Sequence, residues 1–174
     1  MIENISQRLA VGLKKRVPDH PASIAVFRFT IAVLINTVAI ILLTISIGLW
    51  TGRFKEVCVI LVSFALLRVV SGGIHLKSGD KCVVVTTALF TAISLIDMSD
   101  WAVFSLNSLS ILLAYLFAPS RIEKQSKIDQ KHYPKLKFLS IILIATNFLF
   151  MSSILAVTFF VQCITLIKLK EVKR

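Results

Sequence analysis

The sequence predicts an all-α, polytopic membrane protein, and three observations carry this prediction. The 174-residue chain is 56% hydrophobic, and its mean hydropathy of +0.85 is too high for a soluble domain. Its apolar runs are continuous rather than alternating, which indicates helices. Several runs approach or exceed the roughly 17–25 residues that a helix needs to cross the hydrocarbon core of a bilayer. We therefore expect a single integral membrane domain over residues 1–174.

We expect about six transmembrane helices. From the N-terminus to the C-terminus they cover approximately residues 24–50, 55–71, 82–97, 101–118, 135–151 and 153–170. In an alternative interpretation, residues 138–167 form one long tilted helix. A tight hairpin near 151–153 is preferred, because it keeps the basic C-terminal tail on the same side of the membrane as the other basic segments.

Residues 1–20 are expected to form an amphipathic helix that lies in the membrane interface. Apolar residues recur there three or four positions apart, as on one face of a helix. They are Ile2, Ile5, Leu9, Leu13 and Val17. Basic residues are interspersed with them, so we expect no cleavable signal peptide. A frayed polar tail is the alternative for this segment.

The placement of charge predicts the orientation. The formal net charge is +11, and the basic residues gather at the N-terminal segment, the loop 119–137 and the C-terminal tail. With six spans these three regions fall on one side of the membrane, which the positive-inside rule makes the cytoplasm. We therefore expect cytoplasmic N and C termini, contacts with anionic lipid and no nucleic-acid partner.

The candidate chemistry lies between the second and third spans. His75 and Cys82, seven positions apart, belong to sets of only three histidines and three cysteines. Gly72 and Gly73 let the chain leave the preceding helix through conformations that other residues avoid. Asp80 is expected at the N-cap of the third span. Cys82 then falls in the first turn, where the helix dipole favours a negatively charged sulfur, and the pattern predicts a cysteine nucleophile with a histidine base.

Each of these residues also has a structural interpretation. Cys82 can be a small helix residue and His75 an interfacial side chain. Cys58 and Cys163 lie within apolar runs and are expected to be small apolar residues. The three cysteines follow no disulfide spacing and no metal-ligand motif, so we expect no metal and no cofactor.

Further polar residues are supporting candidates. Arg68 is expected either to extend toward the lipid headgroups or to bind a substrate carboxylate or support an oxyanion. Ser71 belongs to the same segment. Asp80 could orient His75, although its charge would oppose an ionised thiol nearby. Interhelical hydrogen bonds are expected from three polar residues within the spans, namely Asn36, Asn147 and Gln162.

The run Arg68…Gly72-Gly73-Ile74-His75…Cys82 resembles the accessory gene regulator B family of bacterial membrane endopeptidases. The glycine pair, the histidine, the cysteine and the His-to-Cys spacing match the pattern of that family. The resemblance extends to the chain length, the several spans, the basic amphipathic start and an Ala118-Pro119 pair that opens a basic loop.

By this resemblance, Cys82 is the nucleophile and His75 the general base of an endopeptidase in a bacterial cell membrane. The implied substrate is a quorum-sensing propeptide with an amphipathic leader and a charged C-terminal tail. Cleavage before the tail leaves the peptide as a thioester on the enzyme. A cysteine or serine within the peptide then closes a thiolactone or lactone ring. The resemblance also implies a homodimer.

A small membrane transporter or exporter of a signalling peptide is the alternative function. Six helices with a few intramembrane polar groups would suit it. The spans lack, however, the charged residues and paired broken helices that are typical of transport sites.

Overall fold

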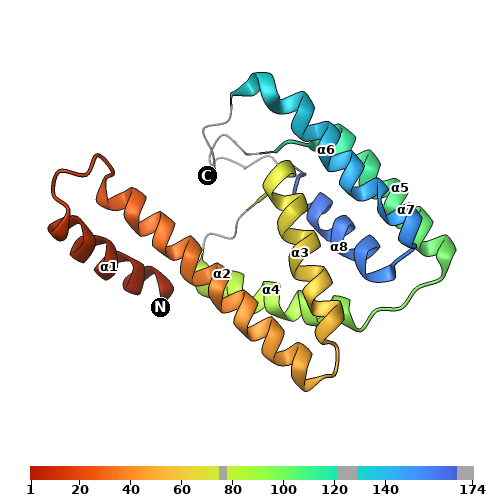
Figure 1. The fold of residues 1–174 in the computed structure, drawn as a ribbon, viewed down its shortest axis with the longest axis horizontal. Helices are drawn as coiled ribbons and strands as arrows, with labels where there is room; N and C mark the ends of the chain where they lie inside the picture. The colour runs from red at the N-terminus through yellow and green to blue at the C-terminus, as the bar shows by residue number, and fades with distance from the viewer. Residues whose placement is uncertain (75–77, 121–128, 168–174) are drawn as a thin grey trace, which may run out of the picture. The chain divides into compact units, whose positions relative to one another are not determined.

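The computed structural model describes residues 1–74, 78–120 and 129–167. In these ranges the regular structure is helical, apart from one isolated bridge between Gly72 and Ser120, so the predicted all-α class is confirmed. The helices, drawn in Figure 1, are α1 (Ile2–Arg16), α2 (Ile24–Trp50), α3 (Phe54–Ser71), α4 (Gly79–Ser94), α5 (Asp100–Phe117), the short 3₁₀ helix η2 (Gln130–His132), α6 (Tyr133–Ala145), α7 (Asn147–Phe150) and α8 (Ser153–Ile164).

The chain divides into two compact units. The first unit comprises Met1–Gly52 and the described part of residues 75–91. The second unit comprises Arg53–Ile74 and the described residues from Ala92 onward. The single membrane domain expected over the whole chain stays a prediction.

In the first unit, α1 lies along α2 (Figure 1). The residues of α1 that become buried are Ile2, Ser6 and Ala10, and the two small side chains allow the helices to approach closely. The other members of the predicted apolar stripe stay exposed, namely Ile5, Leu9, Leu13 and Val17. The predicted N-terminal helix is thus confirmed, and its location in the membrane interface stays a prediction.

The long helix α2 has the predicted bounds. The Ser23 hydroxyl caps its start by accepting a hydrogen bond from the Val26 N–H at 3.4 Å, which satisfies one of the first free N–H groups. The helix ends before Gly52, whose φ of +72° takes the chain into the left-handed region. These are local signals, which explains why the sequence alone places both ends correctly.

In the second unit, α8 packs against α3 and α5, and α6 also contacts both of those helices (Figure 1). The buried core is formed by Leu67, Ala114, Ala118, Ile144, Phe159, Cys163 and Leu166. Cys163 is fully buried in this core, which confirms its interpretation as a small apolar residue. The core holds the C-terminal ends of α3 and α8 in the same unit.

The predicted hairpin between the last two helices is confirmed. Met151 adopts a left-handed conformation with φ of +48°. Asn147 stabilises the turn, because its Nδ2 donates to the Ser152 carbonyl and its Oδ1 accepts from the Ser152 N–H, both at 3.0 Å. The same Nδ2 donates to Asn107 Oδ1 at 3.1 Å. Asn147 therefore makes the interhelical hydrogen bond expected of it.

The described residues contain fewer full spans than the six predicted. Three stretches are long and apolar enough to cross a membrane, namely Ile24–Trp50, Asp100–Phe117 and Gln130–Phe150. α3 has 18 residues but carries Lys55, Glu56 and Arg68. α4 has 16 residues and α8 has 12, and at about 1.5 Å per residue both are shorter than a hydrocarbon core of roughly 30 Å. The continuous hydrophobicity of α3, α4 and α8 therefore led the sequence analysis to predict more full spans than the described helices provide.

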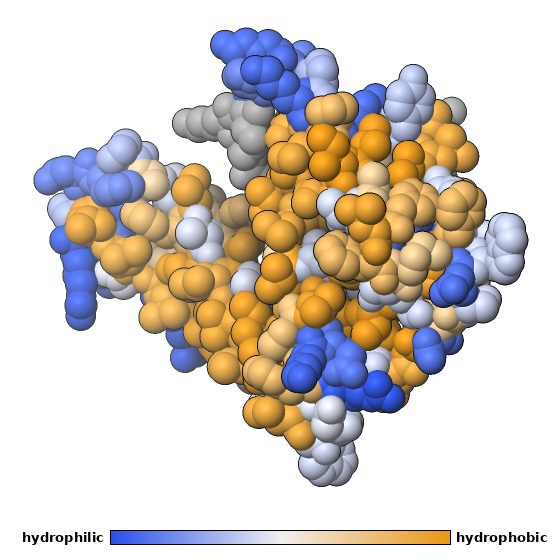
Figure 2. Space-filling view, turned by 45° about the vertical axis from the view of Figure 1, so that its right-hand side comes forward, coloured by the Kyte–Doolittle hydropathy of each residue, from blue (hydrophilic) through white to orange (hydrophobic). Residues whose placement is uncertain are grey.

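The exposed surface is that of a membrane protein. In the part of Figure 2 that shows the second unit, apolar side chains cover most of the visible face. Large apolar side chains such as Leu116, Phe138 and Leu149 are more than half exposed. Exposed apolar area of this extent marks a surface that lipid or protein covers.

Candidate active site

The two glycines that follow α3 have the unusual backbone conformations expected of them. Gly72 has φ of +75° and Gly73 has φ of +126°, in the region that favours glycine. Gly73 also has no room for a side chain, because a Cβ there would lie 2.5 Å from Thr165 Oγ1 and 3.4 Å from Gln162 Nε2. Backbone conformation therefore favours glycine at both positions, and packing also requires it at Gly73.

Gln162 of α8 holds this turn in place. Its side chain is fully buried, and its Nε2 donates to the Gly72 carbonyl at 2.7 Å and to Ser71 Oγ at 3.1 Å. Its Oε1 accepts from Arg68 Nη1 and from Thr165 Oγ1, both at 3.3 Å. A carboxamide can make about four hydrogen bonds, so Gln162 is saturated. The interhelical hydrogen bond expected of Gln162 is confirmed, although its partners could not be foreseen.

Arg68 supports the same turn from α3. Its Nη2 donates to the Ile74 carbonyl at 2.7 Å, while Nη1 donates to Gln162, and its guanidinium lies 5.9 Å from the centre of the Phe64 ring. The expected roles of Arg68 toward lipid headgroups, a substrate carboxylate or an oxyanion stay predictions. Arg68 fixes the backbone directly before residue 75.

Backbone hydrogen bonds complete the turn. The Gly73 N–H donates to the Ser120 carbonyl and the Ser120 N–H donates to the Ser71 carbonyl, both at 2.9 Å. The Ile74 N–H donates to the Thr165 carbonyl at 3.0 Å. We name Arg68–Ile74 with Ser120, Gln162 and Thr165 the glycine turn. Ser120 carried no sequence signal, because only the fold brings it beside Gly72.

Cys82 lies in the first unit, in the opening turn of α4. Its N–H donates to the Ser78 carbonyl at 3.0 Å, and its Sγ is 3.9 Å from Thr86 Oγ1. The side chain is 8% exposed. The predicted position in the first turn of a helix is confirmed.

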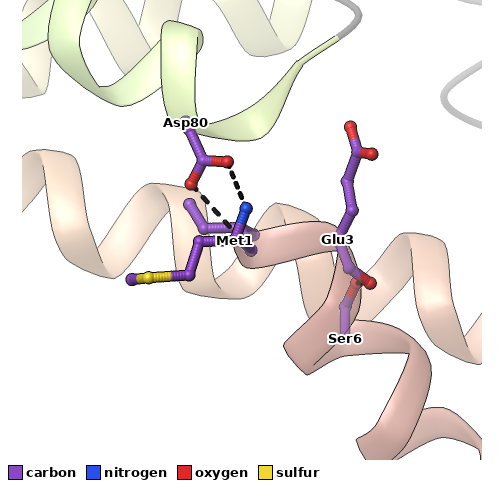
Figure 3. A network of polar contacts seen from close by, with 5 residues as sticks. Met1, Glu3, Ser6 and Asp80 are labelled. Carbon is purple, nitrogen blue, oxygen red and sulfur yellow. Dashed lines mark hydrogen bonds and ion pairs between the residues drawn. The ribbon is translucent and has the colours of Figure 1, made fainter.

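The sequence predicted Asp80 as the N-cap of α4. This prediction is wrong, because the helix already begins at Gly79. Figure 3 shows the Asp80 carboxylate turned toward the start of α1, where it binds the Met1 nitrogen at 2.6 Å and accepts from the Ile2 N–H at 3.3 Å. The hydrogen bond from the Met1 amine, followed by that from Ile2, lowers the pKa of Asp80. Asp80 therefore caps α1 from outside that helix.

Asn36 of α2 touches the start of α4. A Cβ on Gly79 would lie 2.9 Å from Asn36 Oδ1 and 3.2 Å from its Nδ2. Asn36 is 9% exposed, and within the described ranges its Oδ1 is buried without a hydrogen-bond partner. The prediction that Asn36 makes an interhelical hydrogen bond is therefore wrong.

The predicted site residues thus fall into two groups. Arg68, Ser71, Gly72 and Gly73 meet in the glycine turn of the second unit, and Asp80 and Cys82 lie at the start of α4 in the first. His75 belongs to residues 75–77, which lie outside the described residues, and its pairing with Cys82 stays a prediction. The basic residues of the loop at 121–128 and of the tail at 168–174 also lie outside the described residues.

Comparison with known proteins gives a consistent result. The sequence pattern of the family described as Accessory gene regulator B matches residues 5–172. An AgrB-like protein of Halalkalibacterium halodurans is 24% identical over 140 residues, which are 79% of this chain and 70% of that protein. An AgrB-like protein of Listeria welshimeri is 25% identical, over 76% of this chain and 68% of its own. No solved structure matches the chain significantly.

Proposed function

We propose, since the chain belongs to the accessory gene regulator B family, that it is a cysteine endopeptidase of the bacterial cell membrane. Family membership assigns it to quorum-sensing peptide processing. The reaction is the finer step proposed here. Cys82 is the nucleophile, His75 is the general base, and the substrate is a propeptide with an amphipathic leader and a charged C-terminal tail.

The proposed chemistry has two steps. His75 takes the thiol proton, and Cys82 Sγ forms a bond to the carbonyl carbon that precedes the tail. The C–N bond then breaks, and the tail leaves with the proton from the imidazolium on its new amine. The peptide remains as a thioester, and a cysteine or serine within it displaces Cys82 to close a ring. A thioester keeps the carbonyl activated for this second step.

The observation that carries the proposal is the position of Cys82 in the first turn of α4. Unpaired N–H groups at a helix start stabilise negative charge. Among the described residues, the hydrogen-bond partner of the sulfur is Thr86 Oγ1, at 3.9 Å. The Asp80 carboxylate is bound by α1. Within the described part of the chain, the sulfur thus makes one long hydrogen bond and no ion pair with Asp80.

The proposed topology puts this chemistry on the inner face of the membrane, with the N and C termini in the cytoplasm. The basic segments on that side would contact anionic lipid. A newly made propeptide lying on the same leaflet would reach Cys82 without crossing the bilayer. A homodimer is part of the same proposal.

The test is cleavage of a candidate propeptide, to be sought beside the gene as a short reading frame that is amphipathic at its start and acidic at its end. The full chain is co-expressed with it as the parent, Cys82→Ala, His75→Ala and Cys58→Ala forms. We expect cleavage by the parent and Cys58→Ala, and none by the other two, with equal amounts of all four proteins in the membrane. Undiminished cleavage by Cys82→Ala would eliminate the mechanism. Transport of the peptide that persists in that variant, without cleavage, would favour an exporter.

A further inference from the structure

Of the three residues expected to make interhelical hydrogen bonds, Asn36 is the one whose side-chain oxygen has no partner among the described residues. Asn147 and Gln162 both make the hydrogen bonds expected of them. Asn36 is 9% exposed, and this oxygen is buried. Leaving a buried polar group unsatisfied costs about 1–3 kcal/mol, and such groups in native structures are rare enough to need a reason. Ligand binding is one such reason.

The contact that Asn36 makes is with the start of α4. Its two terminal atoms lie 2.9 Å and 3.2 Å from the position where a Cβ on Gly79 would be. Gly79 is the first residue of this 16-residue helix, and the first N–H groups of a helix have no acceptor within it. Gly79 has no side chain, so the carboxamide lies directly over this turn.

Cys82 is on the same side of that turn. Residues three apart on a helix have Cβ positions about 5–6 Å from each other. The carboxamide of Asn36, which lies over Gly79, and the side chain of Cys82 are therefore on the same face of the first turn of α4. All three residues belong to the first unit of the chain.

We propose that Asn36 and the first N–H groups of α4 form the oxyanion site of Cys82. This proposal rests on the proposed function. The Asn36 Nδ2 donates to the carbonyl oxygen of the bond under attack, and Oδ1 accepts an N–H of the substrate backbone. Both polar atoms of the carboxamide then have partners when the substrate is bound. Asn36 is thereby a catalytic residue.

The proposed site acts while charge develops on oxygen. As the Cys82 sulfur bonds to the carbonyl carbon, the C=O electron pair moves onto oxygen, where the donors stabilise it. The pair returns when the leaving group departs, and a thioester remains on Cys82. A preorganised side-chain donor of this type contributes about 10²–10³-fold in rate.

Two small reagents separate this role from a structural one. 4-Nitrophenyl acetate transfers its acetyl group to a thiolate through a tetrahedral oxyanion and releases 4-nitrophenolate. Iodoacetamide alkylates the same sulfur by displacement of iodide, and no oxyanion forms. The rate of each reaction at Cys82 is measured on the full chain in detergent micelles by mass spectrometry of the peptide that contains this residue. Cys58 and Cys163 are thereby counted separately.

The variants are Asn36→Leu, which removes the donor at similar size, and Asn36→Gln, which keeps a carboxamide. Gly79→Ala leaves Asn36 in place but pushes its carboxamide aside, because of the 2.9 Å approach. The matched control is Thr44→Val. Thr44 is also buried in α2, and its hydroxyl donates to the Ile40 carbonyl of the same helix.

We expect Asn36→Leu to slow acetylation of Cys82 by about 10²-fold with the alkylation rate unchanged. Gly79→Ala should lower the ratio of the acetylation rate to the alkylation rate by a smaller factor. Asn36→Gln should keep part of the acetylation rate that Asn36→Leu loses. Thr44→Val should leave the ratio unchanged. An unchanged ratio in Asn36→Leu would overturn the proposal. So would an equal fall of both rates in both Asn36 variants, because Asn36 would then only shape the start of α4. Failure of both reagents to modify Cys82 in the parent chain would instead count against Cys82 as the nucleophile.

Discussion

The end of α3 and the start of α4 are joined by a few residues of sequence, yet their polar groups are used in opposite ways. In the glycine turn, Gln162 makes hydrogen bonds through both of its polar atoms to four partners. At the start of α4, the buried carboxamide oxygen of Asn36 has no hydrogen-bond partner in the part of the chain that the structure describes. The saturated carboxamide of Gln162 rigidifies the turn that it holds, although Ser120 Oγ of the same turn is itself buried without a hydrogen-bond partner among the described residues. An unpaired buried carboxamide beside a candidate nucleophile is instead a group that a ligand can complete. The comparison separates a structural element from a candidate binding element.

The largest expected effect is that of Gln162→Leu, which tests the structural half of the comparison. The substitution leaves the Gly72 carbonyl, the Ser71 hydroxyl and one arm of Arg68 without their buried partner. We expect a loss of about 3 kcal/mol in the free energy of unfolding, measured by denaturation in detergent micelles.

Thr158→Val is the control for Gln162→Leu. Thr158 is fully buried in the same helix, but its hydroxyl donates to the Ile154 carbonyl of its own helix. We expect less than about 1 kcal/mol of change from it. Equal effects of the two substitutions would show that the glycine turn is not specifically stabilised by Gln162.

The next largest effect is that of Gly73→Ala. Its φ of +126° strains any other residue, and the added Cβ would lie 2.5 Å from Thr165 Oγ1. We expect a loss of about 2 kcal/mol and a lower melting temperature in the same micelles. Gly12→Ala, within α1 and with nothing within 4 Å of its Cβ, should instead be neutral or gain up to about 1 kcal/mol. A tolerated Gly73→Ala would show that the turn can rearrange.

The substitution Asn36→Leu has an expected effect of opposite sign. Replacing a buried polar group that has no partner by an apolar one of similar size removes a penalty rather than a bond. We expect a gain of about 1 kcal/mol in the free energy of unfolding, together with the slower acetylation of Cys82 described above. A loss of stability comparable to that of Gln162→Leu would mean that Asn36 is structural, and that the contrast between the two regions does not hold.

The smallest effect concerns Asp80 and pH. Its pKa is lowered by the Met1 amine and then by the Ile2 N–H, so its hold on α1 is present above the ordinary pKa of a carboxyl and is lost as the pH falls through the lowered pKa. Hydrogen exchange in the first turn of α1, corrected for the intrinsic rate, should therefore speed up only in acid.

Asp80→Asn is the reference for that experiment. It should make the first turn of α1 exchange faster at neutral pH, with no further change in acid from this position. The effect is small because the side chains of Met1 and Asp80 are 85% and 46% exposed, and ion pairs between exposed groups are weak. An acid response that persists unchanged in Asp80→Asn would assign it to another group.

Local sequence signals predicted where the helices lie. They predicted less accurately which helices are long and apolar enough to cross the membrane. The bounds of α2 and the hairpin at Met151 follow from residues next to one another in sequence. α3 and α8 were expected to cross the membrane because hydrophobicity runs through them. Charged residues in α3 and the 12-residue length of α8 contradict that expectation. The first turn of α4 was placed correctly for Cys82 and wrongly for Asp80, since an aspartate can cap a neighbouring helix as readily as its own.

By itself, the sequence determined the all-α membrane class, the preference for glycine at 72 and 73, the placement of Cys82 at a helix start and the family. Only the tertiary structure decided that Arg68 and Gln162 hold the glycine turn together, that Asp80 binds α1, and that the Asn36 carboxamide lies over Gly79. The reason is the range of the interactions. Helix formation and backbone conformation depend on neighbours within a turn, whereas Arg68 and Gln162 are 94 positions apart. The partner of a buried polar group depends on which helices pack together.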